Sequence, residues 1–148
     1  IVLHVISAAL WVESVKWNLP QKKDPTKMTR DEFNDFCKSL PHATHVVQWG
    51  GADVWKVGGK VFAIGGWTKT DTLGITFKTS EIGYEVLKDQ PGLRPAPYLA
   101  SRGMKWIQHY DIPGLADDDL KSHIESSHRI VFKGLTKKLQ RELTLHQK

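Results

Sequence analysis

The chain has 148 residues, of which 40% are hydrophobic and 25% charged, a composition typical of one globular domain without a low-complexity linker. Its single cysteine, Cys37, excludes an internal disulfide and favours a reducing, cytoplasmic location. The net charge of +5 comes from the two ends of the chain, since the residues between 28 and 132 hold slightly more acidic than basic side chains. Any contact of the body of the domain with a polyanion must therefore come from a local cluster of cations.

The first segment, IVLHVISAALWV, is apolar but too short to span a bilayer, and no positive region precedes it as in a signal peptide. Met28 opens a segment with the pattern of a helix start. We therefore predict that residues 1–27 form an N-terminal extension, that residues 28–148 form a single domain, and that the chain has no membrane span. A membrane-anchoring helix in the extension is the alternative.

A helix is predicted from Thr29 to Leu40. Thr29 can cap it while Glu32 reaches back to the cap, and Pro41 ends it. The apolar side chains of this segment recur with helical spacing and should face the core: Phe33, Phe36, Cys37 and Leu40. Cys37 is thus interpreted as a small core residue.

Four strands are predicted next, at residues 44–49, 52–57, 60–64 and 73–79, because these segments are rich in branched and aromatic side chains. Gly58 and Gly59 fit a tight hairpin turn that needs positive φ. A phosphate-binding loop would require a following helix, and another strand follows instead. In the fourth strand, Ile75 and Phe77 should face the core and Thr76 and Lys78 the solvent.

A second helix is predicted over 80–89, with Ile82, Val86 and Leu87 facing inward, followed by a proline-rich surface loop. A fifth strand is predicted within 104–112. One last helix begins near Asp117 and carries Lys137, Lys138 and Arg141 at its far end, and its buried stripe is Leu120, Ile124, Val131 and Leu135. The order α-β-β-β-β-α-β-α predicts an α+β fold, a five-stranded antiparallel sheet with helices packed on one face.

Three segments resemble one family: GKVFA at 59–63, PGLRPAPYLASRGMKWI at 91–107 and SSHRIVFKGLTKKL at 126–139. In order and spacing they are similar to the MmcQ/YjbR-like proteins, over about residues 28–143. The resemblance implies a frataxin-like fold and a DNA-binding protein.

The residues indicate no catalytic machinery. Asp117, Asp118 and Asp119 fit the first turn of a helix, where carboxylates complement the helix dipole. Neither His42 with His45 nor His123 with His128 has the spacing of a pair of metal ligands. We expect a protein that is not an enzyme and has no catalytic residue, no metal and no cofactor.

Two groups of cations could contact phosphates of double-stranded DNA. They are Lys56, Lys60, Lys69 and Lys78 around the strands, and Arg94, Arg102 and Lys105 around the proline-rich segment. Trp67, Tyr98 and Trp106 lie between them. The leading hypothesis is a monomeric, cytoplasmic, DNA-binding accessory protein. A solvated face of lysines with tryptophans in the core stays open as an interpretation.

The alternative function is a non-catalytic module that binds a small anionic ligand or a protein partner. Aromatic residues on a concave sheet could line its pocket, with Arg94 or Arg102 holding the anion. The aromatic residues are Trp49, Trp55, Trp67, Tyr98 and Trp106.

Overall fold

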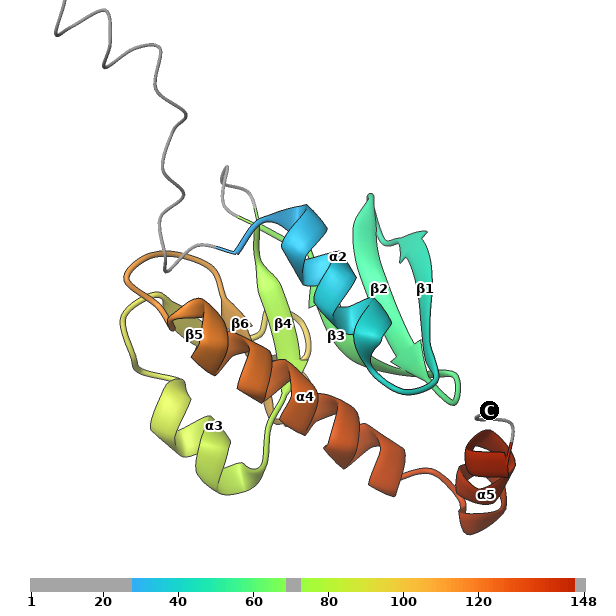
Figure 1. Ribbon diagram of the computed structural model, residues 1–148. Helices are drawn as coiled ribbons and strands as arrows, with labels where there is room; N and C mark the ends of the chain where they lie inside the picture. Colours follow the sequence, from blue (N-terminus) through green and yellow to red (C-terminus); the bar gives the residue numbers. More distant parts are fainter. Residues whose placement is uncertain (1–27, 69–72, 146–148) are drawn as a thin grey trace, which may run out of the picture.

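The computed structural model describes residues 28–68 and 73–145 and shows an α+β domain (Figure 1). Its elements in chain order are α2 (Arg30–Ser39), β1 (Ala43–Gln48), β2 (Ala52–Val57), β3 (Lys60–Gly65), β4 (Ile75–Lys78), α3 (Glu81–Leu87), β5 (Leu93–Pro95), the 3-10 helix η1 (Ala100–Arg102), β6 (Trp106–His109), α4 (Asp117–Lys133) and α5 (Lys137–Leu145). Within these ranges no helix is both long and apolar enough to cross a membrane. The predicted extension lies outside the described residues.

The strands form one antiparallel sheet in the order β1-β2-β3-β4-β6-β5. The sheet has six strands, so the prediction of five was wrong. The additional strand is β5, three residues in the proline-rich segment that was predicted to be a loop. Pro95 has no N–H to donate, and proline is tolerated in a sheet at its edge, where β5 lies.

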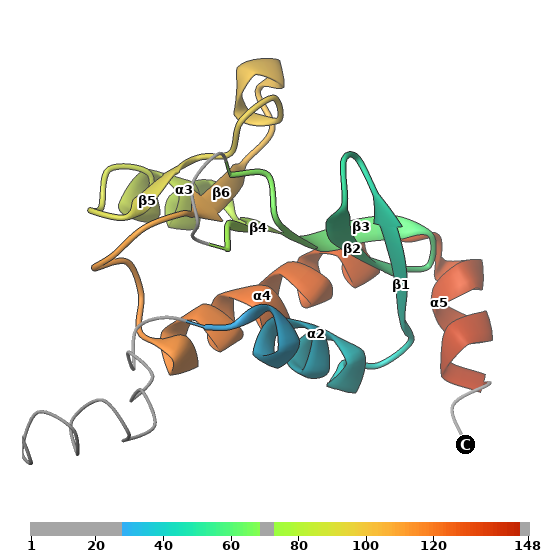
Figure 2. The ribbon, with the colours of Figure 1, turned by 90° about the horizontal axis from the view of Figure 1, so that it is seen from above.

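Helices α2 and α4 cover one side of the sheet, as Figure 2 shows. Between them and the sheet lies the main core, which contains Phe33, Cys37, Trp55, Val57, Phe62, Phe77, Ile107, Leu120 and Ile124, among others. The other side, which we call the open face, is not covered by these two helices. The β1–β2 turn and η1 both project on that side (Figure 2).

Helix α2 begins as predicted. Thr29 accepts a hydrogen bond from the amide of Glu32, and the Glu32 side chain accepts one from the amide of Thr29. Cys37 is fully buried in the core, and burial raises the pKa of its thiol far above the ordinary value. The interpretation of Cys37 as a core residue is therefore confirmed.

Helix α3 departs from the prediction because only one of the three side chains predicted to face inward is buried. Leu87 is buried, whereas Ile82 and Val86 are 78% and 59% exposed. The helix has seven residues and lies at one end of the sheet beside β5 and β6, so only one side of it meets the core. The prediction that Ile82 and Val86 face inward was wrong.

Strand β4 is buried on both sides, which its alternating pattern did not predict. Thr76 is fully buried like its neighbours Ile75 and Phe77. Its hydroxyl accepts a hydrogen bond from the Gln108 side chain of β6, at 3.4 Å. The polar residue Thr76 of β4 is therefore explained by a buried hydrogen bond on the open face and not by contact with solvent.

The last predicted helix is two helices, because α4 ends at Lys133, with Gly134 as its C-cap, and α5 begins at Lys137. The Thr136 hydroxyl accepts a hydrogen bond from the Leu139 amide at 3.1 Å, which is a helix cap. Leu135, between the helices, packs against the β2–β3 turn. A Cβ on Gly58 would lie 2.5 Å from the Leu135 side chain, and the φ of Gly58 is +58°, so glycine is required there. The predicted hairpin is confirmed.

Candidate functional site

The open face of the sheet is positively charged. Among the described strand residues, the lysine and arginine side chains are Lys56, Lys60, Lys78 and Arg94, and we call them the open-face cations. Strand alternation places Lys56, Lys78 and Arg94 on the side opposite the core, because their neighbours Val57, Phe77 and Leu93 belong to the main core. Lys60, which pairs with Val57 at the β2–β3 turn, lines the cavity described below.

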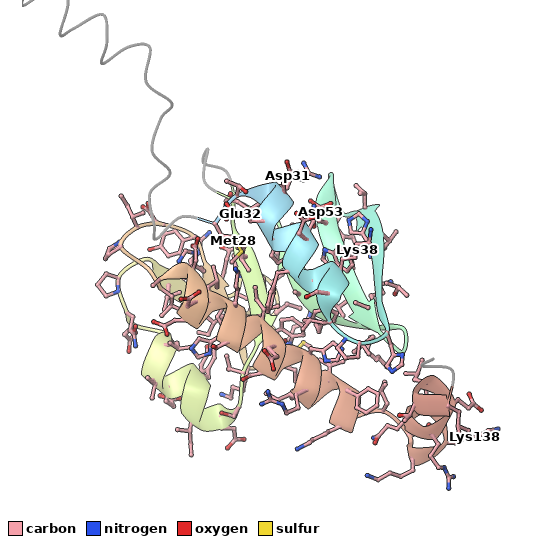
Figure 3. All side chains as sticks on the ribbon, viewed as in Figure 1. Met28, Asp31, Glu32, Lys38, Asp53 and Lys138 are labelled. Carbon is pink, nitrogen blue, oxygen red and sulfur yellow. The ribbon has the colours of Figure 1, made fainter. Side chains whose placement is uncertain are left out.

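The one acidic residue among the described strand residues, Asp53, lies on the helix side between β2 and α2 (Figure 3). Its carboxylate accepts hydrogen bonds from Arg30 of α2 at 2.5 Å and from His45 at 2.8 Å. Burial raises the pKa of Asp53, but the bonds from Arg30 and His45 outweigh it and hold that pKa below the ordinary value. Asp53 therefore stays ionised beneath α2, and no described strand residue brings a carboxylate to the open face.

A gap between β3 and β4 shapes the centre of the open face. Ala63 to Gly65 of β3 pair with Ile75 to Phe77 of β4. The next residues, Phe62 and Lys78, are not paired with each other. The buried Ser127 of α4 takes the place of the missing ladder, because its hydroxyl accepts from the Lys78 amide at 2.8 Å and donates to the Phe62 carbonyl at 2.6 Å. Helix α4 is thereby exposed to the gap between the strands.

A cavity of about 430 Å³ lies at this gap. Three tryptophans and two of the open-face cations line it, together with aliphatic side chains from β3, from the η1 segment and from α4. The lining residues are Trp49, Lys60, Val61, Ile64, Trp67, Lys78, Leu99, Met104, Trp106, Ile130, Val131 and Gly134. This volume lies within the range of small-ligand sites, roughly 300–1,000 Å³. The lining combines flat apolar walls with two ammonium groups.

Three aromatic residues beside the cavity adopt a left-handed backbone: Trp49, Trp67 and Tyr98, with φ of 53°, 66° and 69°. Their rings form a continuous row, with centroid distances of 5.3 Å from Trp49 to Trp67 and 6.1 Å from Trp67 to Tyr98. We call these residues the aromatic row. A bulky residue rarely adopts positive φ, and each instance costs about 1–3 kcal/mol, so such residues cluster at functional sites.

The structure brings four of the predicted site residues into one cavity: Lys60, Lys78, Trp67 and Trp106. Tyr98 contacts the edge of Trp67 and is 73% exposed. Lys56 lies on the open face one strand away. Lys69 lies outside the described residues.

The remaining predicted cations are arranged differently. Arg94 lies on the open face but donates two hydrogen bonds to Gln108, at 2.9 and 2.7 Å, and stacks on the Tyr110 ring. Arg102 is exposed on η1. Lys105 lies over the Tyr84 ring of α3, 4.7 Å from its centroid, away from the cavity. The cations that line the cavity are therefore lysines, whereas Arg94 and Arg102 were predicted for that position.

Trp55 does not line this cavity. It is buried in the main core and donates a hydrogen bond to Asn34 of α2 at 2.9 Å. Sequence reasoning missed Leu99, Met104 and Ser127. Leu99 and Met104 flank the predicted site residues, but nothing in the sequence distinguished Ser127 from other helix serines. In the described ranges, no three histidine, cysteine, aspartate or glutamate side chains converge as a metal site.

The fold and this site define an α+β domain with a six-stranded antiparallel sheet whose second face is basic and aromatic. The family model described as YjbR matches residues 38–130, and the chain belongs to this family. The resemblance seen in the sequence is thus confirmed.

Among solved structures, the chain is similar to protein DR2400 of Deinococcus radiodurans, whose structure is described as a DUF419 domain. The two are 22% identical, the match covers 83% of this chain and 92% of that one, and the TM-score is 0.69. This likeness supports the fold. No curated protein matches the chain. The frataxin-like character of the sheet stays a prediction.

Proposed function

We propose that the domain is a DNA-binding accessory protein that contacts phosphates through its open face. The observation that carries this proposal is the charge separation across the sheet. Lys56, Lys78 and Arg94 lie on one side and Lys60 lines the cavity, whereas Asp53 is held on the other side by Arg30. Lysine and arginine bind phosphates regardless of sequence, and binding of this kind releases counterions.

The test is a salt titration of binding to fluorescently labelled DNA. The logarithm of the association constant should fall linearly with the logarithm of salt concentration, by roughly 0.9 per neutralised phosphate of a duplex. The variant Lys60→Gln/Lys78→Gln should bind more weakly at low salt and have a slope smaller by about two. Binding without salt dependence, or weaker than about 100 µM at low salt, would refute the phosphate mechanism.

The matched control is Lys38→Gln/Lys138→Gln, which removes the same charge from elsewhere. Lys38 lies on α2 and Lys138 on α5 (Figure 3), and both are exposed. This control should keep the salt slope of the wild type. An equal loss in both double variants would mean that total charge, not the open face, determines binding.

The cavity favours a second candidate function, which is binding of a small anionic ligand or of a protein partner without catalysis. Its support is the combination of Trp49, Trp67 and Trp106 with Lys60 and Lys78 in one lining. Under this alternative, a small aromatic anion should change the tryptophan fluorescence in the absence of DNA. The Lys60→Gln/Lys78→Gln variant should then weaken that response.

A further inference from the structure

One buried donor in the cavity lining has no hydrogen-bond partner among the described residues. Trp106 is 4% exposed, and its indole N–H makes no hydrogen bond to any described residue. A buried donor without an acceptor is costly, and such groups in native structures call for an explanation. Because Trp106 belongs to the lining, a ligand with an acceptor on its edge could satisfy this N–H once the side chains that cover the nitrogen move.

The two ends of the aromatic row are open to solvent. Trp49 is 49% exposed and Tyr98 is 73% exposed, whereas Trp67 between them is partly buried and lines the cavity. Nucleic-acid bases stack on exposed aromatic side chains of this kind, and a positively charged groove tracks the strand backbone. The row therefore offers an exposed stacking surface at each of its two ends.

We infer that the cavity binds the base of one unpaired nucleotide, with its phosphate held by Lys60 and Lys78. A nucleotide has three features that complement the lining: a flat ring for the tryptophans, acceptor atoms on the ring edge for the Trp106 N–H, and an attached anion for the lysines. A base inside a duplex is stacked and paired, so it cannot enter a cavity unless it leaves the stack. The inference rests on the proposed function and makes single-stranded DNA the preferred partner.

The experiment compares three probes at one low salt concentration: an oligothymidylate of roughly ten nucleotides, within the usual site sizes of about 4–16, a duplex of the same length, and thymidine monophosphate. Tryptophan fluorescence and anisotropy report binding. The wild-type chain should bind the single strand at least about tenfold more tightly than the duplex, because only unpaired bases can stack on the aromatic row.

Two variants test the cavity itself. Trp67→Gly removes a ring at a position whose positive φ glycine tolerates, and Trp106→Phe keeps a ring but removes the unpartnered N–H. Each should weaken binding of the single strand, the first by roughly 5- to 150-fold as for loss of one stacked base. Neither should alter binding of the duplex. Thermal melts would establish that both variants fold.

The matched control is Trp55→Phe, which removes an indole N–H on the helix side of the sheet, where it bonds Asn34. It should leave the affinity for the single strand unchanged. Equal affinity for duplex and single strand, with no effect of Trp67→Gly or Trp106→Phe, would overturn the inference and leave the proposed function intact.

Binding of the monophosphate but of neither polymer, with weakening in Trp106→Phe, would support the nucleotide site and overturn the DNA function. Binding of none of the three probes would overturn both. The results in which only one of the two proposals fails therefore distinguish the cavity from the charged face.

Discussion

Tyr98 adopts a strained backbone conformation without burying its ring. Its φ is 69° and it is 73% exposed. The Leu99 amide donates a hydrogen bond across it to the Pro97 carbonyl at 2.8 Å, which closes a γ-turn. A γ-turn with positive φ is rare and strained, and glycine tolerates it best. We therefore predict that Tyr98→Gly is more stable than Tyr98→Ala.

The expected difference follows from the two effects of the Cβ atom. Both variants remove the ring, so its contacts cancel in the comparison. Relief of the left-handed conformation favours glycine by about 1–3 kcal/mol. The greater entropy of glycine in the unfolded chain opposes this by about 0.5–1 kcal/mol. The Gly variant should thus have the larger free energy of unfolding, by about 1 kcal/mol.

Urea unfolding of the two variants measures this difference. The control is Ile82 of α3, which is 78% exposed in a helix. There the order should reverse, with Ile82→Gly less stable than Ile82→Ala by about 1 kcal/mol. If Tyr98→Ala equals or exceeds Tyr98→Gly in stability, the positive φ stores no strain, and the functional interpretation of the aromatic row loses its main support.

Two further predictions concern buried polar groups. Ser127→Ala should lower the free energy of unfolding, measured by urea unfolding, by about 2–4 kcal/mol, because the Lys78 amide and the Phe62 carbonyl would each lose a hydrogen-bond partner. No change in stability would mean that water replaces the hydroxyl. Burial lowers the pKa of His128 below its ordinary 6.5, although its hydrogen bond to Pro41 opposes this. The unfolded chain therefore binds a proton near pH 6 that the folded chain does not, and stability falls between pH 7 and pH 5. His128→Gln should lose less stability over that interval, and an equal loss would contradict this assignment.

Local sequence patterns predicted most of the fold because the interactions that determine these elements are short-range. The capping box of α2 spans four residues, and the hairpin at Gly58 and Gly59 needs only its own φ angles. The sixth strand was missed because three residues carry no periodicity. Val86 was wrongly predicted to be buried, because its exposure depends on the small part of α3 that contacts the sheet, which the local sequence does not determine.

The candidate site was predicted in part. Strand alternation separated Lys78 from Phe77 and put Trp106 and Gln108 on one face, but that Lys78 and Trp106 share a face follows from their pairing across β4 and β6. Lys105 immediately precedes Trp106 and so points the other way, towards Tyr84. Arg94 lies on the predicted face, but the sequence does not show that its guanidinium group donates two hydrogen bonds to Gln108. Which cations remain available to a ligand depends on such long-range partners.

In the aromatic row, packing explains the strained backbone of Trp67 but not that of Tyr98. Trp67 packs on a second apolar cluster on the open face, formed by Ala52, Val54 and Ile64, so its strained backbone is offset by buried surface. Tyr98 gains no comparable burial, because most of it is exposed. Strain without burial is expected where a side chain is held for a ligand. The argument from backbone strain therefore depends more on Tyr98 than on Trp67. A loss of binding in Tyr98→Gly together with a gain in stability over Tyr98→Ala would show that the strain serves binding.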